Sequence, residues 1–215
     1  MRDQPSPPTL GSPKLLVFLH VALKQRAFQS ELQAALGDIV VTAVGRTADF
    51  DRGLAEGPDG VLTLPVVLSA HGLPVALQGL RKGTPDEPYA LAGVDTPPDP
   101  ATVASVGVLD VLGRDGMNRF VLGLLGRQPK VERVTKVEDL LPLLQLQRVD
   151  AIVLPSRLLG EVRAPSRLNV VARELPRGMG LPAVSSLRPG GPRIVQAVRR
   201  LPARMAGTLG VSEWR

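Results

Sequence analysis

Asp59-Gly60-Val61-Leu62-Thr63-Leu64-Pro65 and Asp150-Ala151-Ile152-Val153-Leu154-Pro155 are two similar stretches of this chain. Each joins an aspartate to a proline through a short apolar run, which is typical of a buried parallel strand with a turn at its end. Val44 and Val134 continue the match at an offset of 90 residues. Because several matches stay in register, the sequence predicts two lobes that are built alike.

Apolar runs and amphipathic stretches alternate around both segments. Expected strands cover residues 14–19, 39–44, 60–64, 103–109, 131–134 and 151–154, and expected helices cover 25–36, 47–54, 66–71, 117–125 and 137–146. This alternation indicates βαβ units. The predicted fold class is therefore α/β, with two open lobes, mostly parallel sheets and an interlobe cleft. Lobe one is expected to comprise residues 14–80 and about 185–215, and lobe two residues 81–184, after a flexible leader at 1–13.

Composition excludes several classes of protein. The 215 residues include no cysteine and two histidines, so we expect neither disulfides nor a thiolate or histidine-rich metal site. Asp49 and Asp51 lie two apart, diverge on a helix and predict no metal centre. We expect no cofactor and no membrane span, since no apolar run approaches the ~18 residues that a span requires.

Charge is distributed unevenly along the chain. The formal net charge is +6, with −3 in residues 1–107 and +9 in residues 108–215. Such a field favours anionic partners, although a basic composition also serves solubility alone. Six aromatic residues provide few platforms for base stacking, so nucleic acid is not the expected partner.

The order of these elements resembles the type II periplasmic-binding-protein fold, and within it the phosphate/phosphonate (PhnD-like) solute-binding proteins. The resemblance covers about residues 14–200. It is carried by 59–65, by the segment Glu87-Pro88-Tyr89-Ala90-Leu91 and by Glu138 to Pro155. It implies a protein that closes two lobes on a small, anionic ligand, for ABC-type transport or for ligand sensing. The implied partners are the small ligand and an ABC permease or another protein.

Candidate ligand-binding residues follow the predicted strands, because ligands of open α/β sheets bind beyond the carboxyl ends of the strands. A histidine can hydrogen-bond a ligand, and an arginine can fork onto a carboxylate or phosphate. The candidates are His20, Arg46, Thr47, Thr63, Pro65, Asp110, Arg114, Asn118, Lys136, Ser156 and Arg157.

Structural roles for the same residues remain open. Arg46, Thr47, Ser156 and Arg157 could cap helices, and the others could be solvated loop or surface groups. Arg199, Arg200 and Arg204 are expected on an amphipathic C-terminal packing helix.

Two further functions stay as alternatives. The chain contains no GxSxG, HExxH or Walker motif, and this absence favours a protein that is not an enzyme. A cytosolic enzyme on the same fold, similar to a short ATP-phosphoribosyltransferase subunit or a chorismate dehydratase, is one alternative. A scaffold or interaction protein that has lost its ligand is the other. With no small-residue cleavage site after 15–23, the chain as printed would be cytoplasmic; it would be periplasmic if a signal sequence had been removed.

Overall fold

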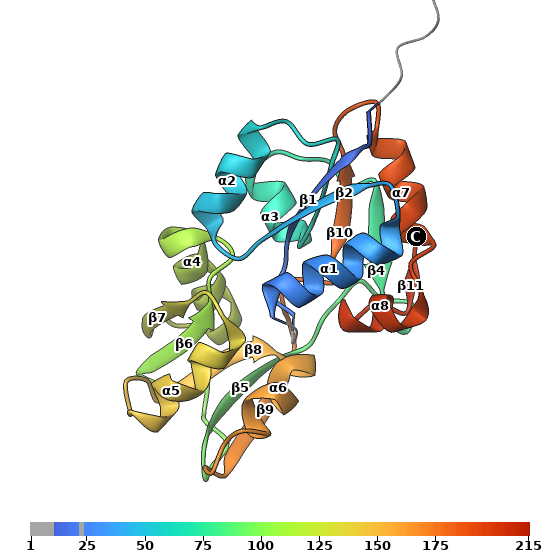
Figure 1. Ribbon diagram of the computed structural model, residues 1–215. Coiled ribbons are helices and arrows are strands. Elements are labelled where there is room, and N and C mark those ends of the chain that lie inside the picture. Colours follow the sequence, from blue (N-terminus) through green and yellow to red (C-terminus); the bar gives the residue numbers. More distant parts are fainter. Residues whose placement is uncertain (1–10, 22–23) are drawn as a thin grey trace, which may run out of the picture.

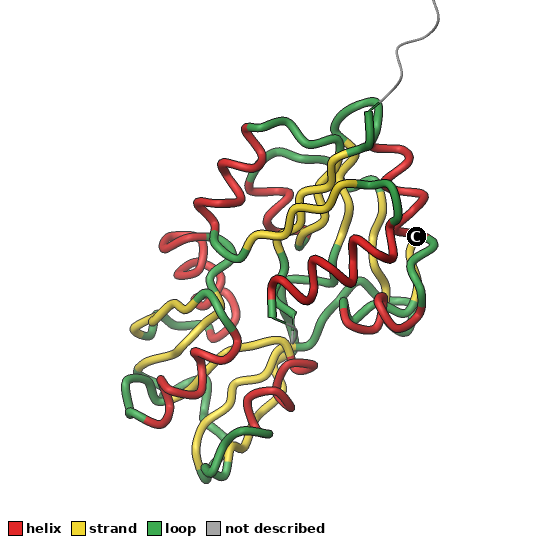
Figure 2. The backbone as a smooth tube through the Cα atoms, in the orientation of Figure 1, coloured by secondary structure: helices red, strands yellow, loops and turns green. Residues whose placement is uncertain are grey.

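The computed structural model describes residues 11–21 and 24–215, which form two β-sheets with helices packed on them (Figure 1). We call the six-stranded sheet and its helices lobe one, and the five-stranded sheet and its helices lobe two. Figure 2 shows the strands of the two sheets gathered in separate parts of the molecule. The α/β fold class and the two lobes are confirmed. Of the expected leader at 1–13, residues 1–10 lie outside the described residues.

Lobe one is built around three parallel strands. The chain runs through β1 (Lys14–Phe18), α1 (Gln25–Leu36), β2 (Val40–Val44), α2 (Thr47–Ala55), β3 (Gly60–Thr63) and α3 (Pro65–Ala70). The sheet is completed by β4 (Leu77–Leu80), β10 (Ala183–Ser186) and β11 (Glu213–Trp214), in the order β11-β4-β10-β3-β1-β2.

Lobe two repeats this arrangement. It contains β6 (Ser105–Leu109), α4 (Gly113–Leu125), β7 (Lys130–Val134), η1 (Val137–Asp139), α5 (Leu140–Gln145), β8 (Ala151–Pro155), η2 (Ser156–Leu158) and α6 (Leu159–Arg163). With β5 (Tyr89–Val94) and β9 (Val170–Leu175), the sheet order is β7-β6-β8-β5-β9.

The internal similarity of the sequence has a structural basis. In each lobe a central strand pairs in parallel with the next two strands, as β2-β1-β3 and as β7-β6-β8. The aspartates of the two matching stretches make equivalent hydrogen bonds. Asp59 accepts a hydrogen bond from the first backbone N–H of β1, at Lys14, and Asp150 accepts one from the first N–H of β6, at Ser105, at 2.9 and 2.8 Å.

Strands that carry the chain between the lobes are antiparallel to these cores. β10 pairs antiparallel with β3, and β5 pairs antiparallel with β8. The sequence predicts mostly parallel sheets because its periodic pattern indicates only the βαβ units. It gives no signal for the antiparallel strands β5 and β10, next to which the chain crosses between the lobes.

Two smaller expectations are corrected. The expected C-terminal helix is two helices, α7 (Gly191–Arg199) and α8 (Ala203–Thr208), since Pro202 cannot continue a helix. Helix α4 begins at Gly113, one turn earlier than residue 117. No helix within the described residues is long and apolar enough to cross a membrane.

One apolar core runs through both lobes. It joins lobe-one side chains such as Phe18 and Leu62 to lobe-two side chains such as Val106 and Val121. Two crossing segments, residues 81–88 and 176–182, connect the lobes and touch each other, because the backbone N–H of Leu181 donates to the carbonyl of Pro85 at 2.7 Å. A second core, around Leu140 and Ile152, lies within lobe two.

A ladder of glutamines closes the free edge of strand β2. Gln25, Gln29 and Gln33 lie at intervals of four on α1. Gln33 accepts from the N–H of Val41 at 2.8 Å and donates to the carbonyl of Ile39 at 2.6 Å; Gln29 accepts from the N–H of Ala43 at 3.0 Å, and Gln25 donates to its carbonyl at 2.6 Å. Four residues of helix rise about 6.0 Å and two residues of strand about 6.6 Å, so the spacings match.

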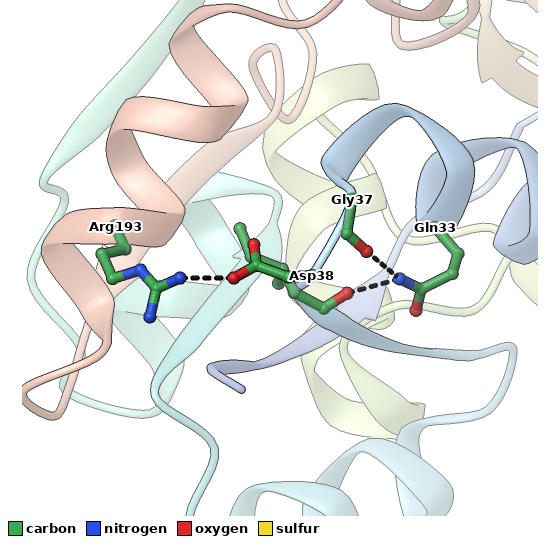
Figure 3. A network of polar contacts seen from close by, with 5 residues as sticks. Gln33, Gly37, Asp38 and Arg193 are labelled. Carbon is green, nitrogen blue, oxygen red and sulfur yellow. Dashed lines mark hydrogen bonds and ion pairs between the residues drawn. The ribbon is translucent and has the colours of Figure 1, made fainter. Parts of the chain in front are cut away.

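The turn between α1 and β2 is also tied to the C-terminal part of lobe one (Figure 3). Gln33 donates to the carbonyls of Gly37 and Ile39, while Asp38 pairs with Arg193 of α7. The turn at residues 37–39 is therefore stabilised both by Gln33 of the ladder and by Arg193 of the distant helix α7.

Replacing Gln33 with alanine should destabilise the fold. The Gln33→Ala change leaves the N–H of Val41 and the carbonyl of Ile39 without their side-chain partners, and we expect a loss of about 1–3 kcal/mol in the free energy of unfolding. Urea denaturation measures it. Gln145→Ala, at an exposed position of α5, is the matched control; equal losses in the two variants would contradict the role of the ladder.

Candidate functional site

An open crevice lies between the lobes, with a volume of about 650 Å³. Its lobe-one wall comes from the end of β1, the start of α1 and the turn from β2 into α2. Its lobe-two wall is the turn after β7, Thr135 to Glu138. We call it the outer crevice. Its volume lies within the range of about 300–1,000 Å³ that is usual for small-molecule sites.

Basic residues occupy the positions just before three helical segments at the outer crevice. Lys24 precedes α1, Arg46 precedes α2 and Lys136 precedes η1. These N-cap positions normally carry Ser, Thr, Asp or Asn, because the helix N-terminus is the positive end of the dipole. Arg26, in the first turn of α1, adds a fourth cation to the lining. Asp49 and Glu138 oppose them with two acidic groups, so the charged side chains that line the crevice sum to +2.

A second, much smaller cavity lies deeper between the lobes, and we call it the inner cell. Its volume is about 20 Å³, room for about one water molecule. It is lined by His20, Leu64, Glu87, Tyr89, Val108, Leu109, Val111, Met117, Phe120, Val153, Pro155, Arg157 and Met179. His20 lines both the inner cell and the outer crevice.

A buried ion pair forms the polar side of the inner cell. Nε of Arg157 donates to Oε1 of Glu87 at 2.5 Å, and the Glu87 side chain is 2% exposed. The second nitrogen of the fork, Nη2, donates to the backbone carbonyl of His20 at 3.0 Å. The His20 ring spans the lobes as well, with Nε2 3.1 Å from the carbonyl of Thr135. The other carboxylate oxygen of Glu87, Oε2, is buried without a hydrogen-bond partner among the described residues.

Burial dominates the acid–base behaviour of this cluster. It lowers the pKa of His20 to about 4, against a smaller opposing effect of the hydrogen bond with Thr135, so the ring is neutral at pH 7. Burial also raises the pKa of Glu87, which the adjacent Arg157 partly offsets. The pKa of Tyr89 is raised far above its ordinary value by the same loss of hydration.

Several predicted site residues meet at the cavities. His20, Arg46 and Lys136 line the outer crevice, and Arg157 lines the inner cell with His20 and Pro155. Thr47, the first residue of α2, lines neither cavity, and its hydroxyl is buried with no hydrogen-bond partner among the described residues.

The structure does not bring the other predicted residues into the lining of either cavity. The Thr63 hydroxyl donates to the carbonyl of Phe18 at 2.7 Å, and Pro65 is the first residue of α3. Asp110 accepts from the N–H of Gly113 at 2.8 Å and pairs with Arg133 at 2.5 Å. Arg114 and Asn118 lie in the first two turns of α4, where Arg114 is exposed, and the N–H of Ser156 donates to the carbonyl of Pro88.

Sequence reasoning missed Glu87 and Lys24. Glu87 lies in a crossing segment with no periodic pattern, although a charge two residues before a buried strand is a usable signal. Lys24 is detectable as a basic residue at the predicted start of a helix, where an acidic or hydroxyl side chain is usual.

Comparison with known proteins identifies the fold. No family model and no curated protein matches the chain. Among solved structures, the periplasmic VFT2 domain of Bordetella pertussis BvgS is similar with a TM-score of 0.61 and 12% identity, over 93% of this chain and 92% of that one. An ancestral arginine-binding protein bound to arginine gives 0.57 and 16%, over 94% and 96%. The GluR0 ligand-binding core of Nostoc punctiforme with L-glutamate gives 0.53 and 12%, over 92% and 95%. The chain has the two-lobed fold of type II periplasmic-binding-protein-like domains.

The lowered pKa of His20 predicts that acid destabilises the protein. Between about pH 6.5 and 4 the unfolded chain binds a proton at His20 and the folded chain does not. The free energy of unfolding therefore decreases as the pH is lowered from 6.5 to 4. When the pH is lowered from 7 to 4, we expect the free energy of unfolding of the His20→Gln variant to fall by roughly 1–3 kcal/mol less than that of the wild type. Urea denaturation at several pH values measures this difference, and parallel profiles would contradict it.

Proposed function

We propose that the chain is a small-molecule-binding module that takes an anionic or zwitterionic solute in the outer crevice. The observation that supports this most directly is a set of basic residues around one interlobe cavity: Lys24, Arg46 and Lys136 directly precede α1, α2 and η1. Positive side chains at the positive ends of helices repel the dipole, and a bound anion relieves that repulsion. A carboxylate or phosphate would therefore gain from both the side chains and the backbone N–H groups.

Two acidic groups in the lining of the outer crevice narrow the expected class of ligand. Asp49 and Glu138 also line the crevice, and their carboxylates could accept hydrogen bonds from an amine. A ligand that carries an anionic and a cationic group, such as an amino acid, would use both sets. The bound arginine and L-glutamate of two structural neighbours agree with this class. Phosphate and phosphonates, which the sequence resemblance implies, would use the basic set alone.

A panel of ligands tests the proposal. Differential scanning fluorimetry would compare L-glutamate, L-glutamine, L-arginine, inorganic phosphate, a phosphonate and a small dicarboxylate. A ligand at 100 times its dissociation constant stabilises the folded state by about 2.7 kcal/mol, which is readily detected as a rise in Tm. A panel without any rise would count against the proposal.

Removing single basic residues should weaken binding of the ligand that the panel selects. We expect Arg46→Gln and Lys136→Gln each to raise Kd about tenfold or more, because hydrogen bonds to charged groups contribute about 1.5–3 kcal/mol. Isothermal titration calorimetry measures the change. Arg199→Gln, in the last turn of α7, removes the same charge outside the crevice lining and should leave Kd unchanged. Equal effects of all three variants would point to the overall field of the protein instead.

A scaffold or interaction module is the second candidate. The observation that favours it is the filled inner cell, where the chain's own apolar side chains occupy most of the deep interlobe space. In that case the panel would give no rise in Tm, and binding of an acidic protein or nucleic acid would weaken steeply with added salt.

A further inference from the structure

Side chains of the chain itself fill the deep part of the interlobe space. Met117 and Phe120 come from α4, Met179 from the second crossing segment and Leu64 from the end of β3. Phe120 packs edge to face on Tyr89 with ring centroids 5.6 Å apart. Together they leave about 20 Å³, far below the volume of a small organic ligand.

Arg157 makes the polar contact across this space. Glu87 lies two residues before Tyr89, which pairs with Pro155 in the lobe-two sheet. Glu87 therefore accepts the hydrogen bond of Arg157 from the lobe-two side of the interlobe space. The other arm of the guanidinium reaches the carbonyl of His20, at the end of the lobe-one strand β1. The ring of His20 in turn forms a hydrogen bond with the carbonyl of Thr135 in lobe two. Lobe separation would therefore break two hydrogen bonds that both involve His20.

We infer that the two lobes close without a ligand, with Arg157 as an internal latch that Glu87 holds in position. The latch fixes His20 and Thr135, which also line the outer crevice, so any solute meets a crevice that is already formed. Opening would expose the apolar groups around Met117 and Met179 to water. It would also remove the His20 carbonyl from Nη2 of Arg157, whose side chain is only 12% exposed. Both effects favour the closed state in the absence of any solute.

Distance measurements on the ligand-free chain test this inference. The sequence has no cysteine, so a Gln145→Cys and Gln196→Cys pair accepts two spin labels at exposed positions of α5 in lobe two and α7 in lobe one. Double electron–electron resonance should give one narrow distance distribution without ligand. Adding Arg157→Gln should broaden the distribution and shift it to longer distances. Arg163→Gln is the matched control, because Arg163 donates to the carbonyl of Val170 within lobe two, and it should leave the distribution unchanged.

Each other outcome overturns the inference. A broad or long distribution in the labelled wild type would show that the lobes are open without a ligand. A narrow distribution in the Arg157→Gln variant would show that Arg157 is no latch. Should that variant fail to fold by circular dichroism, Glu87→Gln with Arg157→Gln leaves no unpaired charge in the inner cell and must give the same broadening. These distances need no ligand, so a silent ligand panel would defeat the proposed function and leave this inference standing.

Discussion

The arrangement of the two lobes depends on one guanidinium group. Arg157 lies in η2, directly after β8, and its fork joins a carboxylate on its own side of the interlobe space to a backbone carbonyl on the other. Two donors in one rigid plane fix both the distance and the orientation of their acceptors. Because one acceptor is the carbonyl of His20, this single side chain sets where β1 ends relative to β8, and with it the width of the outer crevice.

A buried pair of this kind is a device of specificity more than of stability. Dehydrating both charges offsets most of their attraction, and apolar side chains of the same volume would often stabilise the fold as well. Apolar surfaces, however, can slide over each other, whereas the Arg157 fork accepts one register. The unpaired Oε2 of Glu87 adds to the cost of burial, which is tolerated in a core that extends through both lobes. In this view the apolar cluster supplies the driving force, and the pair selects the geometry.

Local patterns in the sequence were sufficient for the fold because the strands of βαβ units carry their own signal. The two Asp-to-Pro stretches predict β3 and β8, and their offset predicts two similar lobes. The glutamine ladder was not predictable in the same way. Gln25, Gln29 and Gln33 read as the polar face of α1, and their meaning depends on an edge strand that the helix packs against. Glu87 and Arg157 were equally hard to pair, since 70 residues separate them and neither lies in a periodic segment.

The distribution of charge between the two cavities follows from the same geometry. Three parallel strands in each lobe end at the interlobe boundary, so the residues after them meet there whatever their chemistry. Most of the described residues that line the inner cell are apolar, and the charged Arg157 and Glu87 there pair with each other. At the outer crevice, Lys24, Arg46 and Lys136 remain in contact with water. Exposed cations at helix starts oppose the helix dipole and weaken their own helices. A crevice that concentrates three of them carries an unfavourable field which a bound anion would neutralise, and the closed inner cell keeps that anion in the outer crevice.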